Sequence, residues 1–281
     1  MAARADVGAN EDDYNPGIGA TAMAAVSAGR PDYGVDAPGV IRNLLLVAFT
    51  GLLTWATARA GWWSGSIGNA HVTIHVAQSV LWPGSACAIT AVWMLWHSKV
   101  GKVRGREALL DQLTWTGAER VLDIGCGRGL MLIGAARRVA RGTATGIDIW
   151  QEEDLSGNHP DATRQNAIRE GVADRVTVQT ADMRALPFAD GSFDVVLSSA
   201  AIHNLYEAHD RLKAINEIAR VLKPGGQLLI DDIRHCSEYA KGLRQAHCTV
   251  RRTDARIISL LTTLWTFGSL RPGTLLATKS A

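Results

Sequence analysis

The stretch VLDIGCGRGL, residues 121–130, combines a short apolar run, an acidic residue and three glycines at alternate positions. The apolar run predicts a buried strand, and the residues after Gly129 predict a helix. Glycine between a strand and a helix permits a tight turn and lets the backbone approach a ligand closely. The stretch therefore predicts a nucleotide-type binding loop within an α/β domain.

Strand and helix signals alternate from about residue 105 onward. Repeated β-α-β units predict a mostly parallel, doubly wound sheet that binds its ligand beyond the carboxyl ends of the strands. The predicted strands are ERVLDIG (119–125), GTATGIDI (142–149), RVTVQTAD (175–182), SFDVVLSSAAI (192–202), QLLIDDI (227–233), TVRRTDARI (249–257) and GTLLATKS (273–280). The predicted helices are GLMLIGAARRVA (129–140), ATRQNAIREGV (162–172), AHDRLKAINEIARVL (208–222) and SEYAKGLRQAHC (237–248).

Three acidic residues, Asp123, Asp148 and Asp182, lie near the ends of the first three predicted strands. Asp148 comes 19 residues after Gly129, a position suited to two ribose hydroxyls. Asp123 would repel a pyrophosphate but can accept from an ammonium group, and Asp182 suits the exocyclic amine of an adenine. The spacing is DxGxGxG and not GxGxxG, which disfavours a nicotinamide-dependent oxidoreductase. S-adenosylmethionine, a cationic nucleoside without phosphate, fits this acidic set better.

Four ordered motifs, VLDIGCGRG, GIDIW, TADMRALPFADGSFDVVLSS and RVLKPGGQLLI, resemble the class I S-adenosylmethionine-dependent methyltransferases. The nearest resemblance is to the branch that holds the quinone C-methyltransferases and other small-molecule enzymes, and it covers roughly residues 105–280. It implies a Rossmann-like, seven-stranded sheet with an antiparallel final strand. The cofactor-binding residues predicted with it are Asp123, Gly125, Gly127 and Gly129 for the methionine moiety, Asp148 for the ribose, Asp182 and Met183 for the adenine, and Ile149 and Ser198 in the same site.

Candidate catalytic side chains follow the fourth predicted strand, in SSAAIHNLYE, residues 198–207. His203 is predicted to act as a general base or to orient the acceptor by a hydrogen bond, with Asn204 beside it. The alternative is a histidine that only shapes the pocket, because methyl transfer from a sulfonium requires mainly proximity and orientation. Asp231 and Asp232, which end the fifth strand, are either acceptor-pocket or structural residues.

Two further segments lie near the expected cleft. In WQEEDLSGNHPDAT, residues 150–163, Trp150 is predicted to stack on the adenine edge. The acidic residues of this run suit a cationic acceptor, but a solvated loop with Asp161 or Thr163 capping the next helix is favoured. The run IISLLTTLWTF, residues 257–267, is too short to span a bilayer. Core packing is favoured for it over an apolar lid that dips into the membrane interface.

The sequence predicts three parts of the chain. These are a disordered tail (1–39), a two-helix transmembrane hairpin (40–98) and the methyltransferase domain (99–281). The tail is rich in Gly, Ala and Asp and lacks the composition of a folded core. Two uncharged apolar runs follow, with Trp62 and Trp63 placed as an interfacial belt. The basic segment HSKVGKVRGR, residues 97–106, comes directly after the second run. The positive-inside bias predicts that both termini and the catalytic domain are cytoplasmic.

Composition excludes some functions. The formal net charge of +2 gives no basic footprint for nucleic acid. The four cysteines show neither CxxC spacing nor a cluster with histidine, so no metal site is predicted, and Cys126 is expected to be a small buried filler.

The sequence therefore predicts a membrane-anchored methyltransferase that uses S-adenosyl-L-methionine. The expected acceptor is a small apolar molecule, such as a quinone, a phenolic lipid, a polyprenyl or fatty-acid derivative, or a thiol. One alternative is a soluble enzyme whose apolar N-terminal helices cover the active site or dimerise. Another is a non-catalytic scaffold or assembly protein with a methyltransferase fold. The oligomeric state is left open.

Overall fold

A computed structural model describes residues 29–62, 70–253, 256–266 and 268–280. The helices are α2 (Pro38–Arg59), α3 (Ala70–Trp96), the π-helix η1 (His97–Gly101), α4 (Lys102–Leu110), α5 (Leu130–Ala136), α6 (Pro160–Arg169), α7 (Ala208–Val221), α8 (Cys236–Gln245) and α9 (Arg256–Trp265), with short 3₁₀ turns η2 (Ala173–Arg175) and η3 (Ile202–Asn204). The strands are β1 (Arg120–Ile124), β2 (Thr143–Asp148), β3 (Val176–Thr180), β4 (Phe193–Ser199), β5 (Leu222–Asp232), β6 (Cys248–Arg252) and β7 (Gly273–Lys279).

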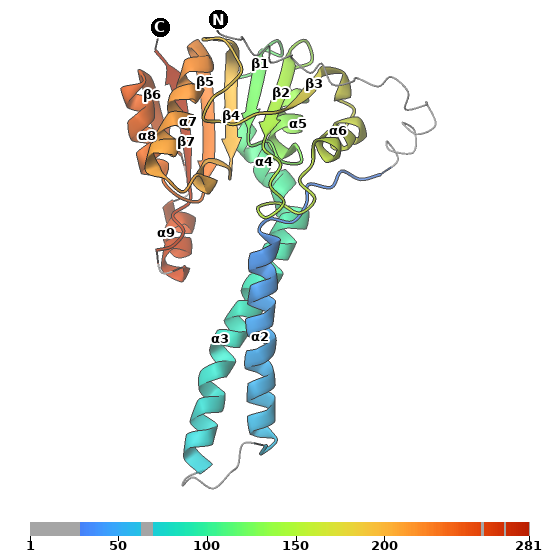
Figure 1. Ribbon diagram of the computed structural model, residues 1–281, viewed down its shortest axis with the longest axis vertical. Helices are drawn as coiled ribbons and strands as arrows, with labels where there is room; N and C mark the ends of the chain where they lie inside the picture. The colour runs from blue at the N-terminus through green and yellow to red at the C-terminus, as the bar shows by residue number, and fades with distance from the viewer. Residues whose placement is uncertain (1–28, 63–69, 254–255, 267, 281) are drawn as a thin grey trace, which may run out of the picture.

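The seven strands form one sheet in the order β3-β2-β1-β4-β5-β7-β6 (Figure 1). β7 pairs antiparallel with both β5 and β6, and the remaining pairs are parallel. The predicted seven-stranded, Rossmann-like sheet with an antiparallel final strand is confirmed. The strand order reverses between β1 and β4, the switch point where α/β sheets bind ligands.

Apolar side chains fill both faces of the sheet, which explains the near-continuous apolar runs of the central strands. On one face α5 and the end of α4 pack through Leu132, Ile133 and Leu110, all fully buried. On the other face α7 and α8 pack through Ile218 and Leu243. These two layers hold the carboxyl ends of β1, β2 and β4 rigidly at one edge of the sheet.

Helices α2 and α3 form a hairpin that projects away from the sheet domain on the side of its carboxyl edge (Figure 1). Small residues form the contact between the helices: Ala48 and Ala91 are buried, and a Cβ added to Gly51 would lie 3.3 Å from the Cα of Gly84. The large apolar side chains point outward instead. The exposed ones on α2 and α3 are Val40, Leu45, Leu46, Val47, Phe49, Leu52, Leu53, Trp82, Ile89, Val92, Trp93, Leu95 and Trp96.

Two helical stretches, Pro38–Arg59 and Ser79–Leu110, are long and apolar enough to cross a membrane. The second runs without a break from α3 through η1 into α4, so the hairpin and the sheet domain share one continuous helix. Trp63 and most of the connector between the helices lie outside the described residues. Two of the basic residues that favoured a cytoplasmic exit are buried: Lys102 pairs with Asp36, and Arg106 pairs with Glu170.

The expectation of a disordered tail over 1–39 is wrong for its last part, while residues 1–28 lie outside the described residues. Residues 32–37 form an ordered strap along the loop that follows β2. Val35 N–H donates to the hydroxyl of Ser156, and Ala37 N–H donates to the carbonyl of Asp154. Tyr33 is buried and its hydroxyl donates to Glu170 at 2.5 Å. Composition missed the strap because its partners are distant in the sequence.

The C-terminal segment also differs from expectation. The predicted strand 249–257 ends at Arg252, and α9 begins at Arg256. Core packing, favoured for 257–267, is wrong for three leucines of α9: Leu260, Leu261 and Leu264 are each at least 58% exposed.

Candidate active site

The glycine loop turns sharply between β1 and α5. The backbone N–H groups of Gly125 and Cys126 both donate to the carbonyl of Ile147 on β2, which ties the loop to the neighbouring strand. Gly125 has φ +70°, and a Cβ there would collide with the Cβ of Ala201 at 2.3 Å. A side chain at this position would therefore close the space between the loop and the end of β4.

Asp123 is the buried acid of the site, and its Oδ2 has no hydrogen-bond partner among the described residues. Burial raises the pKa of Asp123 to about 7, and the charge of Asp148 contributes in the same direction. The backbone N–H of Leu132 binds the carboxylate and opposes this shift. An unsatisfied buried carboxylate oxygen is costly, and a cationic donor would remove that cost.

Asp148 lies at the end of β2, next to the glycine loop. Its Oδ2 accepts from Gly127 N–H at 2.8 Å, and its Oδ1 accepts from Trp150 N–H at 2.7 Å. Asn158 Nδ2 donates to the same Oδ1 at 3.3 Å. These bonds hold the carboxylate beside the loop, as a ribose-binding acid requires.

Trp150, which is predicted to stack on the adenine edge, lies just past the end of β2. Its indole N–H donates to the hydroxyl of Thr180 at the end of β3, and its backbone has φ +62°. Ala200 and His235, which follow β4 and β5, also have left-handed backbones. Strained backbones of this kind concentrate at functional sites, and all three lie at the carboxyl edge of the sheet.

Asp182 and Met183 follow β3. The guanidinium of Arg184 binds both carboxylate oxygens of Asp182, with Nη2 at 2.6 Å from Oδ2, and this lowers the pKa of Asp182. Arg184 also binds Asp210, so an adenine amine would share Asp182 with an existing ion pair. Met183 packs against the core close to Gly125, and Ile149 exposes half of its side chain at the end of β2.

His203 is held by a buried carboxylate that the sequence left undecided. Its Nδ1 lies 2.6 Å from Oδ1 of Asp232, and its backbone N–H donates to Oδ2 of the same residue at 3.1 Å. The hydroxyl of Tyr239 also donates to Asp232, at 3.4 Å. Asp232 is buried, whereas the His203 side chain is 17% exposed. If Nδ1 carries the proton that Asp232 accepts, Nε2 is left with a free lone pair.

Asn204 lies beside His203, but its amide binds the loop after β2. Its Nδ2 donates to Oδ2 of Asp154 at 2.8 Å. Burial raises the pKa of Asp154, and the nearby His203 opposes this shift. The loop 151–158 therefore reaches across to the end of β4 and is not merely a solvated run. The helix cap also differs from expectation: His159 Nδ1 accepts from Asp161 N–H, and Thr163 donates to the carbonyl of Gly127.

Ser198, a predicted cofactor-binding residue, and Cys126, a predicted filler, are both buried. Ser198 is buried and donates to the carbonyl of Ile124, which links β4 to β1. Cys126 is buried, and burial raises the pKa of its thiol well above its ordinary value, consistent with an inert filler.

Comparison with known proteins agrees with this geometry. Residues 122–230, from β1 to β5, match the family Methyltransf_11, described as a methyltransferase domain. Over these residues the chain is similar to a methyltransferase domain. The match contains the glycine loop, the three acids of the predicted donor site and His203, in agreement with the S-adenosylmethionine-dependent kind of methyltransferase that the motifs predicted.

The similarity to curated relatives covers only part of each relative's length. Methyltransferase GfsG of Streptomyces halstedii is 37% identical over 130 residues, which cover 46% of this chain and 43% of that protein. A ubiquinone/menaquinone biosynthesis C-methyltransferase, UbiE of Roseobacter denitrificans, is 34% identical over 125 residues, which cover 44% and 46% of the two chains. The chain thus matches less than half the length of these relatives. The YcgJ protein of Bacillus subtilis shares the fold, with a TM-score of 0.50 and 18% identity over 63% of this chain and 99% of that chain.

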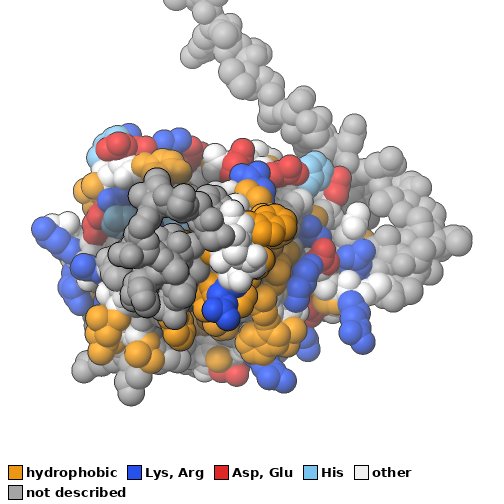
Figure 2. Space-filling model, turned by 90° about the horizontal axis from the view of Figure 1, so that it is seen from below, with side chains coloured by type: hydrophobic (Ala, Val, Ile, Leu, Met, Phe, Trp, Pro, Cys, Tyr) orange, Lys and Arg blue, Asp and Glu red, His pale blue; other side chains and the backbone are white. Residues whose placement is uncertain are grey.

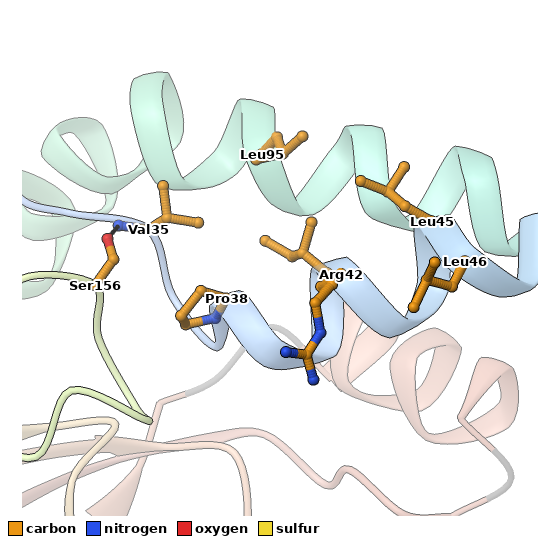
Figure 3. A pocket seen from close by; sticks show the side chains of 8 residues that line it. Val35, Pro38, Arg42, Leu45, Leu46, Leu95 and Ser156 are labelled. Atoms are coloured by element: carbon orange, nitrogen blue, oxygen red, sulfur yellow. Dashed lines mark hydrogen bonds between the residues drawn. The ribbon is translucent and has the colours of Figure 1, made fainter. Parts of the chain in front are cut away.

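An apolar cavity of about 460 Å³ lies where the hairpin joins the methyltransferase domain (Figure 3). Leu45 and Leu46 of α2, Leu95 of α3 and Val35 of the strap line it, and Ser156 closes it on the side of the loop after β2. The Arg42 side chain points away from α3 in this view. Ser156, which lines the cavity, follows Leu155, whose side chain lies against Gly127 of the glycine loop.

Proposed function

We propose that this chain is a membrane-anchored, S-adenosylmethionine-dependent methyltransferase that acts on a small lipophilic acceptor. The observation that carries the catalytic part is the unpaired, buried oxygen of Asp123 next to the glycine loop. The outward-facing apolar side chains of the hairpin carry the membrane part.

The residues present fit the methyl donor. The ammonium of its methionine moiety would supply the hydrogen-bond donor and the charge that Asp123 lacks. Asp148, already oriented by Gly127, would accept from the ribose hydroxyls, and Ile149 and Met183 would flank the adenine. The bound donor supplies an activated methyl group on a sulfonium, so the protein needs mainly to align the acceptor and exclude water.

His203 would remove the proton of the acceptor. Asp232 holds the ring by Nδ1, which leaves Nε2 to take a proton from a hydroxyl, thiol or acidic carbon as the new bond to the methyl group forms. Asp232 would then stabilise the imidazolium by its negative charge. A histidine used only for packing would not need a buried carboxylate, since a neutral imidazole can be satisfied by a backbone carbonyl.

The hairpin has the packing pattern of membrane helices. A water-soluble helical hairpin buries its large apolar side chains, whereas α2 and α3 meet through Ala48, Gly51, Gly84 and Ala91 and expose leucine, valine and tryptophan. At 22 residues α2 is long enough to cross the hydrocarbon core of a bilayer. Exposed Lys99 and Arg104 after α3 favour a cytoplasmic sheet domain.

An apolar acceptor follows from where the donor site lies. The carboxyl edge of the sheet faces the hairpin (Figure 1), so the site would be held against the bilayer surface. The apolar cavity lined by Leu45, Leu46 and Leu95 lies between that surface and the loop that covers Gly127. An acceptor dissolved in the bilayer would reach the site without crossing water.

Calorimetry with S-adenosylmethionine tests the donor site. Wild-type protein and Asp174→Ala, which changes an exposed acid on η2, should bind, and Asp148→Ala should not bind while keeping the native circular dichroism spectrum. No binding by wild type would refute the proposal and favour the scaffold alternative.

Tritiated S-adenosylmethionine with a total lipid extract tests the acceptor. Label is expected in the organic phase, and label confined to the aqueous phase would exclude a lipophilic acceptor. Carbonate extraction of membranes tests the anchor: protein released into the supernatant would favour the soluble alternative, in which α2 and α3 cover the active site or dimerise.

A further inference from the structure

Helix α9 presents a row of leucines that no described part of the chain covers. Leu260, Leu261 and Leu264 are 58%, 60% and 64% exposed, and positions i, i+1 and i+4 lie on one face of a helix. Outside residues 38–110, the exposed large apolar residues among the described residues are Ile149, Tyr206, Leu212, Leu260, Leu261 and Leu264, and α9 holds three of these six. Thr262 and Thr263, on the other side, are half-buried.

The position of α9 relates it to the hairpin. It connects β6 to β7 at the carboxyl edge of the sheet, the edge that holds Asp148 and His203. In Figure 1 it hangs from that edge toward the same side as the hairpin and reaches the level of the first turns of α2. The first turns of α2, the part of the helix that includes the exposed Val40, therefore lie near the level of α9 along the long axis (Figure 1).

The charged residues from Arg256 to Gly273 are all basic, although Asp254 lies two positions before α9. The segment 256–273 has no Asp or Glu, and the residues between Asp36 and Glu107 also have none. Exposed arginines bind the backbone at the base of α9: Arg234 donates to the carbonyl of Ser269, and Arg252 donates to the carbonyl of Pro272. Arg271 is exposed beside them. Viewed from this end, Lys and Arg side chains, together with some Asp and Glu side chains, lie around apolar ones (Figure 2).

We infer that α9 is a second membrane-contacting element, which inserts its leucine face into the leaflet that the start of α2 enters. Leucines on one face of a short helix, with arginines at the level of the lipid phosphates, are what an interfacial helix requires. The inference rests on the proposed membrane location. It adds that the mouth of the donor site is pressed onto the bilayer at two points, α2 and α9, so the acceptor enters from the lipid between them.

Fluorescence quenching in vesicles tests this contact with the full-length chain. A single environment-sensitive fluorophore is placed at Leu261→Cys on α9, at Leu53→Cys on α2, or at Ala118→Cys, an exposed site at the opposite edge of the sheet. Cys87→Ala removes the one half-buried native thiol, and the other three cysteines are buried. The vesicles contain phosphatidylcholine and phosphatidylglycerol, with or without phospholipid carrying a spin-label quencher in the acyl chain.

Quencher lipid should lower the signal at Leu261 and Leu53 about twofold or more and leave Ala118 unchanged. Omitting phosphatidylglycerol should weaken the effect at Leu261, because the arginines then lack anionic partners. Quenching at Leu53 but not at Leu261 would overturn the α9 contact and leave the proposed anchor standing. Quenching at Leu261 alone would uphold the α9 contact and contradict the hairpin anchor.

Two other outcomes would also overturn the inference. Quenching at neither Leu53 nor Leu261 would contradict the membrane location itself. A Leu261 signal that changes with protein concentration in the absence of lipid, and not with quencher lipid, would identify a second copy of the chain as the partner of α9.

Discussion

The Nδ1 atom of His203 lies 2.6 Å from the buried Oδ1 of Asp232, so a residue just past β4 is oriented by the last residue of β5. This pair predicts that His203 transfers a proton and that Asp232 orients the imidazole ring of His203. His203→Gln should lower kcat about a hundredfold or more while the affinity for S-adenosylmethionine changes little. Asp232→Asn should lower kcat and shift its pH profile, because the ring loses its charged partner. If kcat falls only together with the melting temperature, and the pH profile of kcat is unchanged, the pair is purely structural.

Asp123 predicts that donor binding depends on pH. Its pKa is raised to about 7 in the folded protein from an ordinary value of 3.8. Below pH 7 the folded protein keeps a proton on Asp123, which the donor's ammonium must displace. Affinity for S-adenosylmethionine should therefore rise by about tenfold per pH unit up to pH 7 and level off above it. Titration calorimetry from pH 5.5 to 8.5 measures this slope.

The raised pKa of Asp123 also predicts that, without bound donor, the stability of the fold decreases as the pH rises, whereas donor affinity increases. A raised carboxyl pKa contributes stability that is fully present below the unfolded-state pKa of about 3.8 and lost as the pH rises through about 7. Asp123→Asn should remove this loss and the slope of donor affinity, at the cost of weaker binding. Asp174→Asn, at an exposed position, serves as the matched control. If Asp123→Asn bound S-adenosylmethionine as tightly as wild type at pH 8, the proposed role of Asp123 would be contradicted.

The bond between Asn204 and Asp154 predicts a latch across the site. Because Asn204 Nδ2 lies 2.8 Å from Asp154 Oδ2, the loop after β2 must release it to open. Asn204→Ala and Asp154→Ala should each speed donor dissociation about fivefold, the value of one typical hydrogen bond. In stopped-flow measurements the double variant should match either single variant. Additive effects would show that the two residues act separately.

The strap predicts a stability contribution from Tyr33. Its hydroxyl binds Glu170 at 2.5 Å in a buried setting that also includes Arg106. Tyr33→Phe should lower the free energy of unfolding by about 1–3 kcal/mol, as for a hydrogen bond to a charged group. Tyr206→Phe is the control, because Tyr206 is 93% exposed. Equal melting temperatures for the two variants would show that the Tyr33 hydroxyl adds nothing to the stability of the fold.

The close approach of α2 and α3 predicts that Gly51 cannot be enlarged. A Cβ at Gly51 would lie 3.3 Å from backbone atoms of α3, whereas a Cβ at Gly39 meets nothing within 4 Å. Gly51→Leu should destabilise the hairpin by about 1–3 kcal/mol, as overpacking does, and Gly39→Leu should not. Thermal unfolding in detergent micelles, followed by circular dichroism, compares them. Equal stability would place the helix contact elsewhere.

The sequence by itself determined the sheet and the likeness of its donor site to known methyltransferases. The stretch around Asp123 and Gly125 predicted its own turn because apolar periodicity and glycine spacing are local properties. Exposed leucines on α2 are also what the predicted membrane hairpin requires, because α2 contains a run of 16 uncharged residues between Arg42 and Arg59.

Only the tertiary structure decided what depends on contacts distant in the sequence. The role of Asp232 was undecided from the sequence, because its partner His203 is 29 positions away. The fold brings the two side chains within 2.6 Å of each other. The strap at Tyr33 and the latch at Asp154 are formed by partners 137 and 50 residues away. The leucines of α9 read as core because their periodicity is that of any amphipathic helix, and what such a helix faces is a property of the surrounding structure.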